Sequence, residues 1–149
     1  MKVNRFKRLW RGRALWLYGL ESVVWLAFAK ICIFGLPFRW WIRWCGVAQC
    51  ETLRATPTPR QREQIYKTQR AVRFSARKVP WPSVCLDQAL TVQWMLARRG
   101  IASTLYLGML KDAQGEWTAH AWIRSGPHGV IGYQPHCAYT VVGTYAAFK

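Results

Sequence analysis

The sequence predicts an α+β fold, in which amino-terminal helices precede one central helix packed on a small antiparallel sheet. Three observations support this prediction. Apolar residues recur every three or four positions over residues 6–34, a second helical pattern runs from 83 to 99, and short alternating segments follow. At 149 residues the chain is long enough to bury one core and too short to predict two.

The first half reads as helices separated by proline and glycine. Residues 6–34 form one long helix or two short ones, and Gly35–Pro37 ends that pattern. Residues 37–46, PFRWWIRWCG, predict a short helix that opens at its proline and ends at Gly46, with its tryptophans packing a core or a neighbouring helix. The Pro-rich stretch 56–64 is a turn into a helix over 59–77.

The second half contains the central helix and the strands. Ser83 is placed to cap a helix through Arg99, with Gly100 just beyond its end. The apolar positions predicted to be buried are Leu86, Ala89, Leu90, Met95 and Leu96. Residues 102–110, 117–125 and 129–134 then predict three strands.

Charge divides the chain into a basic, Trp-rich helical region, 1–78, and a core, 79–149, which we expect to form one compact unit. The first region has 17 Lys or Arg and three acids, a net +14, and the second has 5 against 3, a net +2. Such a region suits a polyanion, an anionic membrane or an acidic protein, although basic residues also simply keep a Trp-rich surface soluble. Arg39 and Arg43 lie in it.

Five cysteines, with no C-x-x-C pair, support neither a disulfide framework nor a zinc site, so the sequence predicts a cytoplasmic protein without metal or cofactor. Four are expected to be small buried hydrophobes, namely Cys32, Cys45, Cys50 and Cys137. The amino terminus imitates a signal peptide, but Glu21 interrupts its apolar region. A helix lying on a membrane surface stays open.

Cys85 and His120 are the candidate chemical groups. Cys85 lies in the first turn of the central helix, where the helix dipole favours a thiolate. Alternation in WTAHAWIRS puts Thr118, His120, Trp122 and Arg124 on one strand face and Ala119, Ala121 and Ile123 on the other. A cysteine and a histidine so placed can form a nucleophile and base pair, while plain packing of either residue is the competing interpretation.

A family resemblance adds to this interpretation. The matching motifs are Pro82, Cys85-Leu86, Ala89-Leu90, Arg98-Arg99-Gly100, Leu107-Gly108 and Ala119-His120-Ala121-Trp122. They resemble the transglutaminase-like, papain-like core of the lasso-peptide leader peptidases, specifically the standalone carboxy-terminal half of the split B protein. The apolar helices before the core resemble that family too.

The resemblance implies a cysteine peptidase that removes the leader from a ribosomally made precursor before macrolactam closure. Cys85 would be the nucleophile, with its backbone N–H helping to hold the oxyanion, and His120 the base. The family's orienting Asp is replaced here by Tyr133, so Gln134 becomes the expected substitute. The implied partners are the precursor peptide, a separate leader-recognition protein and an ATP-dependent cyclase.

Two other functions remain open from the sequence. A weakly active or silent copy would bind the precursor as a scaffold. A basic, Trp-rich module would bind nucleic acid or an anionic membrane, because Arg neutralises phosphates and Trp stacks on bases. Nucleic acid is the less favoured ligand, since the sequence contains no nucleic-acid-binding motif.

Overall fold

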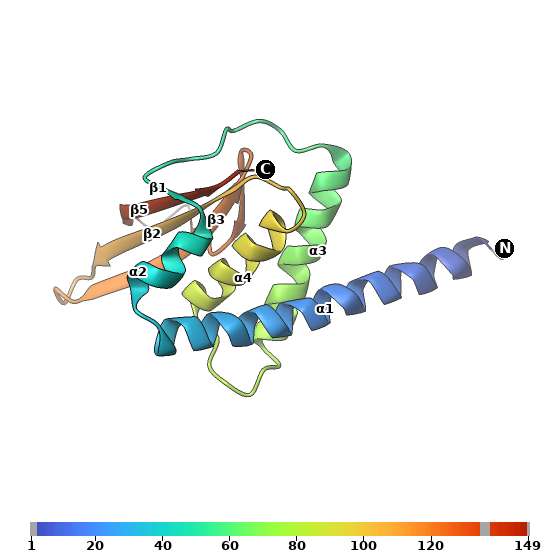
Figure 1. Cartoon of the computed structure of the whole chain (residues 1–149), viewed down its shortest axis with the longest axis horizontal. Helices are drawn as coiled ribbons and strands as arrows, with labels where there is room; N and C mark the ends of the chain where they lie inside the picture. Colours follow the sequence, from blue (N-terminus) through green and yellow to red (C-terminus); the bar gives the residue numbers. More distant parts are fainter. Residues whose placement is uncertain (1–2, 135–137, 149) are drawn as a thin grey trace.

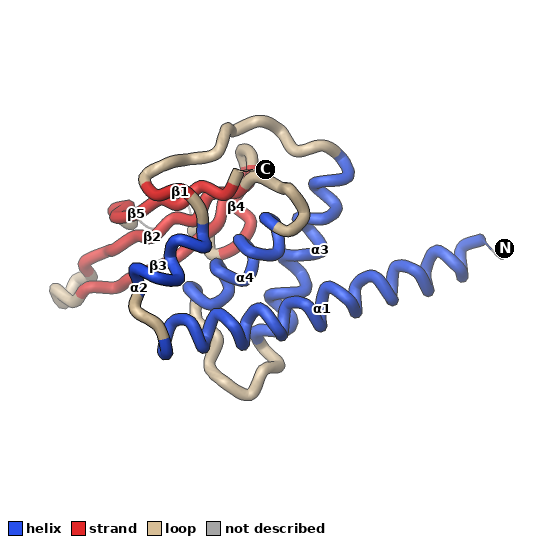
Figure 2. Tube along the Cα trace, viewed as in Figure 1, coloured by secondary structure: helices blue, strands red, loops and turns tan. Residues whose placement is uncertain are grey.

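The computed structural model describes residues 3–134 and 138–148. A five-stranded antiparallel sheet of order β1-β5-β2-β3-β4 forms one layer, and α1, α3 and α4 lie on one side of it (Figure 1, Figure 2). The elements are α1 (Val3–Gly35), α2 (Phe38–Trp41), the 3-10 turn η1 (Ile42–Cys45), β1 (Val47–Ala48), α3 (Pro59–Ala76), α4 (Cys85–Ala97), β2 (Ser103–Lys111), β3 (Trp117–Ser125), β4 (His128–Ile131) and β5 (Thr140–Ala147). The predicted α+β fold is confirmed.

The amino-terminal helices lie where the sequence predicts, although α1 begins at Val3 and the short helix predicted over 37–46 is divided into α2 and η1. Residues 6–34 belong to one uninterrupted helix, α1, whose first turns extend beyond the rest of the molecule (Figure 1). The α3 helix opens with a capping box, in which the Thr58 hydroxyl accepts from Gln61 N and the Gln61 side chain accepts from Thr58 N. Gly46 ends η1 with φ +121°, and a Cβ there would lie 2.1 Å from a backbone oxygen of β5.

The tryptophans of residues 37–46 divide between core and surface. Trp41 is buried in the core cluster, as predicted, whereas Trp40 and Trp44 are exposed. The Trp44 ring stacks on Phe28 of α1, which agrees with the predicted packing against a neighbouring helix, whereas Trp40 is exposed and does not belong to the core cluster.

The start of α4 differs in one detail from the prediction. Ser83 does not cap the helix, and its hydroxyl has no hydrogen-bond partner among the described residues. The Asp87 carboxylate instead accepts from the backbone N–H of Val84 at 3.1 Å. A carboxylate in the first turn also interacts favourably with the helix dipole, which makes Asp87 the better cap. Gly100, at φ +62°, occupies the left-handed position after the helix, as predicted.

The sheet is larger than the three predicted strands. All three are present, but β5 and the two-residue β1 were not predicted. β5 pairs with β2 from Ser103↔Ala147 onward and lies between β2 and β1, so it is an internal strand of the sheet. Its place depends on pairing with residues more than thirty positions away, which local alternation cannot reveal.

The core lies between α4 and the sheet. Most of α4 is buried against α1, α3 and the sheet, including the predicted Leu90 and Met95. The buried side chain of Gln93 donates to the carbonyl oxygens of Cys45 and Tyr145 and accepts from the Ser103 hydroxyl. Its buried amide is therefore paired with η1, β5 and β2 at once.

Two ion-pair clusters join α1 to α4. Lys30 Nζ lies 2.6 Å from Asp87 Oδ2, and Asp87 is fully buried. Glu21 pairs with both Arg98 and Arg99 at the other end of α4. Burial acts to raise the pKa of Glu21, but the hydrogen bond and charge of Arg99 outweigh it and the pKa lies below the ordinary value. These charges fix how α1 lies across α4.

Candidate functional site

Cys85 is the first residue of α4. Its side chain is half-buried and packs against the hydrophobic core. The backbone N–H groups of this turn have no acceptor within the helix, so they can stabilise an anion beside the thiol. The nearby negative charge of Asp87 is balanced by Lys30 at 2.6 Å. The helix start therefore remains suited to binding negative charge.

His120 lies in the middle of β3, opposite Gly108 of β2. Its Nε2 is 2.6 Å from the backbone oxygen of Gly132, and its ring stacks on Tyr139 with centroids 5.0 Å apart. A carbonyl oxygen can only accept, so in the neutral imidazole Nε2 carries the proton. Nδ1 is then the basic nitrogen that can take a proton from a thiol.

The two candidate groups come from elements that pack together, since α4 lies against β3. The alternation on β3 follows the prediction. Ala121 and Ile123 are buried in the core with α4, whereas His120 and Trp122 belong to the opposite set and stack with Tyr139. Among the hydrogen bonds of the described residues, none joins Cys85 to His120. Cys85 is therefore held by its packing against the core, and His120 by its hydrogen bond to Gly132 and its stacking on Tyr139, but the two side chains do not share a hydrogen bond.

The orienting position is where sequence reasoning missed a group. Tyr133 and Gln134 are exposed residues just after β4, and the role of Gln134 stays a prediction. The acceptor bonded to His120 is instead the backbone carbonyl of Gly132, which lies two residues before Gln134 in the chain. Gly132 has φ +71°, and a Cβ there would lie 2.4 Å from the Ala121 oxygen, so this turn requires glycine. A glycine directly after a strand was the available indication.

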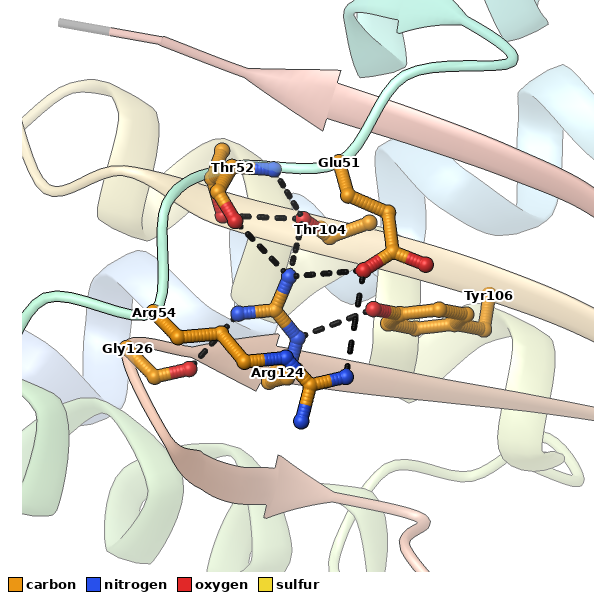
Figure 3. Close-up of polar contacts among 7 residues, drawn as sticks. All are labelled: Glu51, Thr52, Arg54, Thr104, Tyr106, Arg124 and Gly126. Carbon is orange, nitrogen blue, oxygen red and sulfur yellow. Dashed lines mark hydrogen bonds and ion pairs between the residues drawn. The ribbon is translucent and has the colours of Figure 1, made fainter.

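A buried arginine, also missed, organises the other end of β3 (Figure 3). The Arg124 guanidinium donates to Tyr106 Oη at 2.8 Å and to the carbonyls of Gly126 at 2.6 Å and Thr52 at 2.9 Å. Glu51 pairs with it at 3.2 Å. Five donors fixed in one plane suit such a site, and the network attaches the loop before α3 to the sheet.

The other four cysteines differ in their surroundings. Cys32 and Cys45 are buried, as predicted, and burial raises the pKa of Cys45 to about 12. Cys50 is only half-buried, so the prediction of a buried hydrophobe is wrong there, because the loop that carries it runs along the surface. Cys137 lies outside the described residues. Within the described part of the chain, no three His, Cys, Asp or Glu side chains could hold a metal ion.

A central helix that begins at a cysteine and packs on an antiparallel sheet whose β3 strand carries a histidine is consistent with a fold of the cysteine-peptidase type. Comparison with known families agrees with this class. The chain belongs to the transglutaminase-like superfamily, whose model matches residues 32–144. No curated protein and no solved structure shows significant similarity to the chain.

Proposed function

We propose that this protein is a cysteine peptidase that removes the leader from a lasso-peptide precursor. Membership of the transglutaminase-like superfamily supports the cysteine-peptidase class. The finer assignment is supported by the Cys85-Leu86 and Ala119-His120-Ala121-Trp122 motifs, which resemble those of the leader peptidases. The observation that carries the proposal is the imidazole of His120, whose bond to Gly132 O leaves Nδ1 available as a base.

The proposed reaction runs through a thioester. The Cys85 thiol gives its proton to Nδ1 of His120, and Sγ bonds to the carbonyl carbon of the scissile peptide. This transfer requires the two side chains to come closer than in the present structure, where His120 lies on the β3 face opposite the core. The Cys85 backbone N–H stabilises the oxyanion. The imidazolium then protonates the leaving amine, the C–N bond breaks, and the amine departs as the new amino terminus of the core peptide. Water, deprotonated by His120, hydrolyses the thioester and restores the thiol.

The hydrogen bond to Gly132 performs the work that the family assigns to a carboxylate. A backbone carbonyl holds the ring and its tautomer, and its partial negative charge stabilises the imidazolium less than a full carboxylate does. We therefore expect a slower peptidase than one with an Asp at this position. Gln134 remains the proposed second orienting group after Gly132.

The proposal includes a cytoplasmic setting and three partners, which are the precursor, a separate leader-recognition protein and an ATP-dependent cyclase. Arg39 and Arg43 are exposed on α2 and η1 and are our candidates for contact with one of these partners. Unchanged co-purification of the partners with an Arg39→Ala, Arg43→Ala protein would remove these residues from the interface.

The test is leader release measured by mass spectrometry. Precursor and leader-recognition protein are incubated with the wild type, Cys85→Ala, His120→Gln, or Cys50→Ala as the matched control, because Cys50 is also a half-buried free cysteine. We expect release by the wild type and Cys50→Ala, and loss of at least a thousand-fold with Cys85→Ala. Release that survives Cys85→Ala would contradict the mechanism.

A second function is a precursor-binding scaffold without turnover. Two observations favour it: among the described residues no hydrogen bond joins Cys85 to His120, and His120 belongs to the β3 face opposite the core. A wild type that binds the precursor but releases no leader under the same conditions would establish the scaffold.

A further inference from the structure

The outer face of α1 is apolar and uncovered. Six side chains on it are each more than half exposed, namely Trp16, Leu17, Leu20, Val24, Ile31 and Phe34. With 3.6 residues per turn, these six positions fall within an arc of about 100°. A helix on the surface of a globular protein ordinarily carries charged side chains there. Within the described residues, Leu15–Gly35 is also the one stretch long and apolar enough to cross a membrane.

The opposite face of α1 argues against crossing. Leu26, Ala29 and Cys32 are fully buried against the rest of the protein. The two charged residues of this stretch point inward: Lys30 pairs with Asp87 of α4, and Glu21 pairs with Arg99 just after α4. A helix held this way can lie on a bilayer with one face, but it cannot leave the protein without separating both ion-pair clusters.

Basic residues border the apolar face on the α3 side. A groove of about 430 Å³ runs between α1 and α3. Its wall includes Trp16, Leu20 and Val23 from α1, Arg70 and Phe74 from α3, and Lys78 just after α3. Phe74 is 63% exposed, and the Lys78 ammonium lies over its ring at 5.9 Å. Two cations therefore stand at the edge of the apolar surface.

The other border of α1 continues the same surface. Phe28 stacks on Trp44 of η1 with ring centroids 5.9 Å apart, and Trp44 is more than half exposed. Arg43 is its exposed neighbour in the chain. The sequence of residues 3–14, which form the first turns of the same helix, adds five Lys or Arg and no acid. Apolar and aromatic groups are thus flanked by positive charge on both sides.

We propose that the apolar face of α1 binds a membrane surface rich in anionic phospholipid, with α1 lying in that surface. The six outer side chains offer no hydrogen-bonding group except the indole of Trp16. An interface with another protein ordinarily contains about one hydrogen bond per 100–200 Å² of buried area. The acyl region of a bilayer needs no hydrogen bond from the protein. The basic border matches anionic headgroups, and tryptophan favours the membrane–water interface.

The test is flotation of the full chain with vesicles of phosphatidylcholine alone or with about one third phosphatidylglycerol. Leu20→Glu is compared with Leu53→Glu, the same change at a leucine that is 84% exposed in the loop before α3. We expect the wild type to float with anionic vesicles and Leu20→Glu to bind about ten-fold more weakly or worse. Leu53→Glu should bind like the wild type. Arg70→Ala with Lys78→Ala should weaken binding to anionic vesicles.

The opposite results would overturn the proposal. These are a wild type that stays unbound with both vesicles, or equal losses for Leu20→Glu and Leu53→Glu. Sedimentation of the same samples without lipid addresses the competing occupant. If the wild type dimerises, Leu20→Glu is monomeric and neither binds vesicles, the face belongs to a second copy of the chain and the membrane proposal is wrong.

Discussion

Replacing Asp87 by Asn should destabilise the protein strongly, although the change removes only a charge. The carboxylate is fully buried, accepts from Val84 N and lies 2.6 Å from Lys30 Nζ, whose side chain is 21% exposed. Asn still offers an oxygen to Val84, so the lost quantity is the ion pair. Removing one partner of a buried pair costs about 3–5 kcal/mol. Because Lys30 keeps some contact with water, we expect about 3 kcal/mol.

The assay is urea unfolding followed by tryptophan fluorescence, with melting temperature as a second reading. About 3 kcal/mol corresponds to a decrease of roughly 6–12 °C in a chain of this size. Asp112→Asn is the matched control, because Asp112 is exposed and accepts two backbone N–H groups in a turn. It should change stability by less than about 0.5 kcal/mol.

The Lys30→Met variant completes a double-mutant cycle. Each single change leaves a buried or half-buried group without its partner, so the double variant with Asp87→Asn should lose less than the sum of the two singles. An Asp87→Asn protein as stable as the Asp112→Asn control, or strictly additive losses, would refute the reasoning that this pair joins α1 to α4.

Three further predictions concern single residues. Arg124→Met should cost about 2–4 kcal/mol in urea unfolding, because buried carbonyls lose their donor; a loss under 1 kcal/mol would contradict this. Gly132→Ala should lower leader release more than ten-fold by moving the acceptor of His120, with precursor binding retained; unchanged release would remove Gly132 from the site. Iodoacetamide at pH 8 should label Cys50 and spare Cys45, because burial raises the pKa of Cys45 to about 12. The free energy of unfolding should also fall as the pH rises above about 9, because the folded state holds the Cys45 proton more tightly than the unfolded state does. Labelling of Cys45 in the native protein would be inconsistent with its burial.

The helices could be predicted because their boundaries are local. Pro59 after Thr58, Gly46 and Gly100 each act within one turn of the helix they start or end. The strands 103–111 and 117–125 were equally clear from their alternation.

The missed features depend on residues far apart in the chain. β5 contains several residues that favour strands, but Gly143 at its centre interrupts their alternation, and its position inside the sheet depends on the pairing with β2. The Arg124 network joins residues 72 positions apart, at Thr52 and Arg124. Asp87 rather than Ser83 caps the start of α4, because Lys30 of α1 holds the Asp87 carboxylate beside the backbone N–H of Val84.

The candidate site divides in the same way. Cys85 and His120 were found from their positions in a helix and a strand, and the structure places them in those elements. The acceptor for His120 was not found, because a backbone carbonyl has no residue type that a sequence could reveal.

The central claim is that His120 activates Cys85, and the most direct measurement is the rate of alkylation of each cysteine, resolved by peptide mapping. The half-buried Cys50 in the same molecule is the internal reference. We predict that iodoacetamide at pH 7 modifies Cys85 at least ten-fold faster than Cys50, and that His120→Gln, which can still donate to Gly132 O, abolishes the difference without changing the rate at Cys50. Equal rates in the wild type, or a fast Cys85 that is unaffected by His120→Gln, would contradict the account.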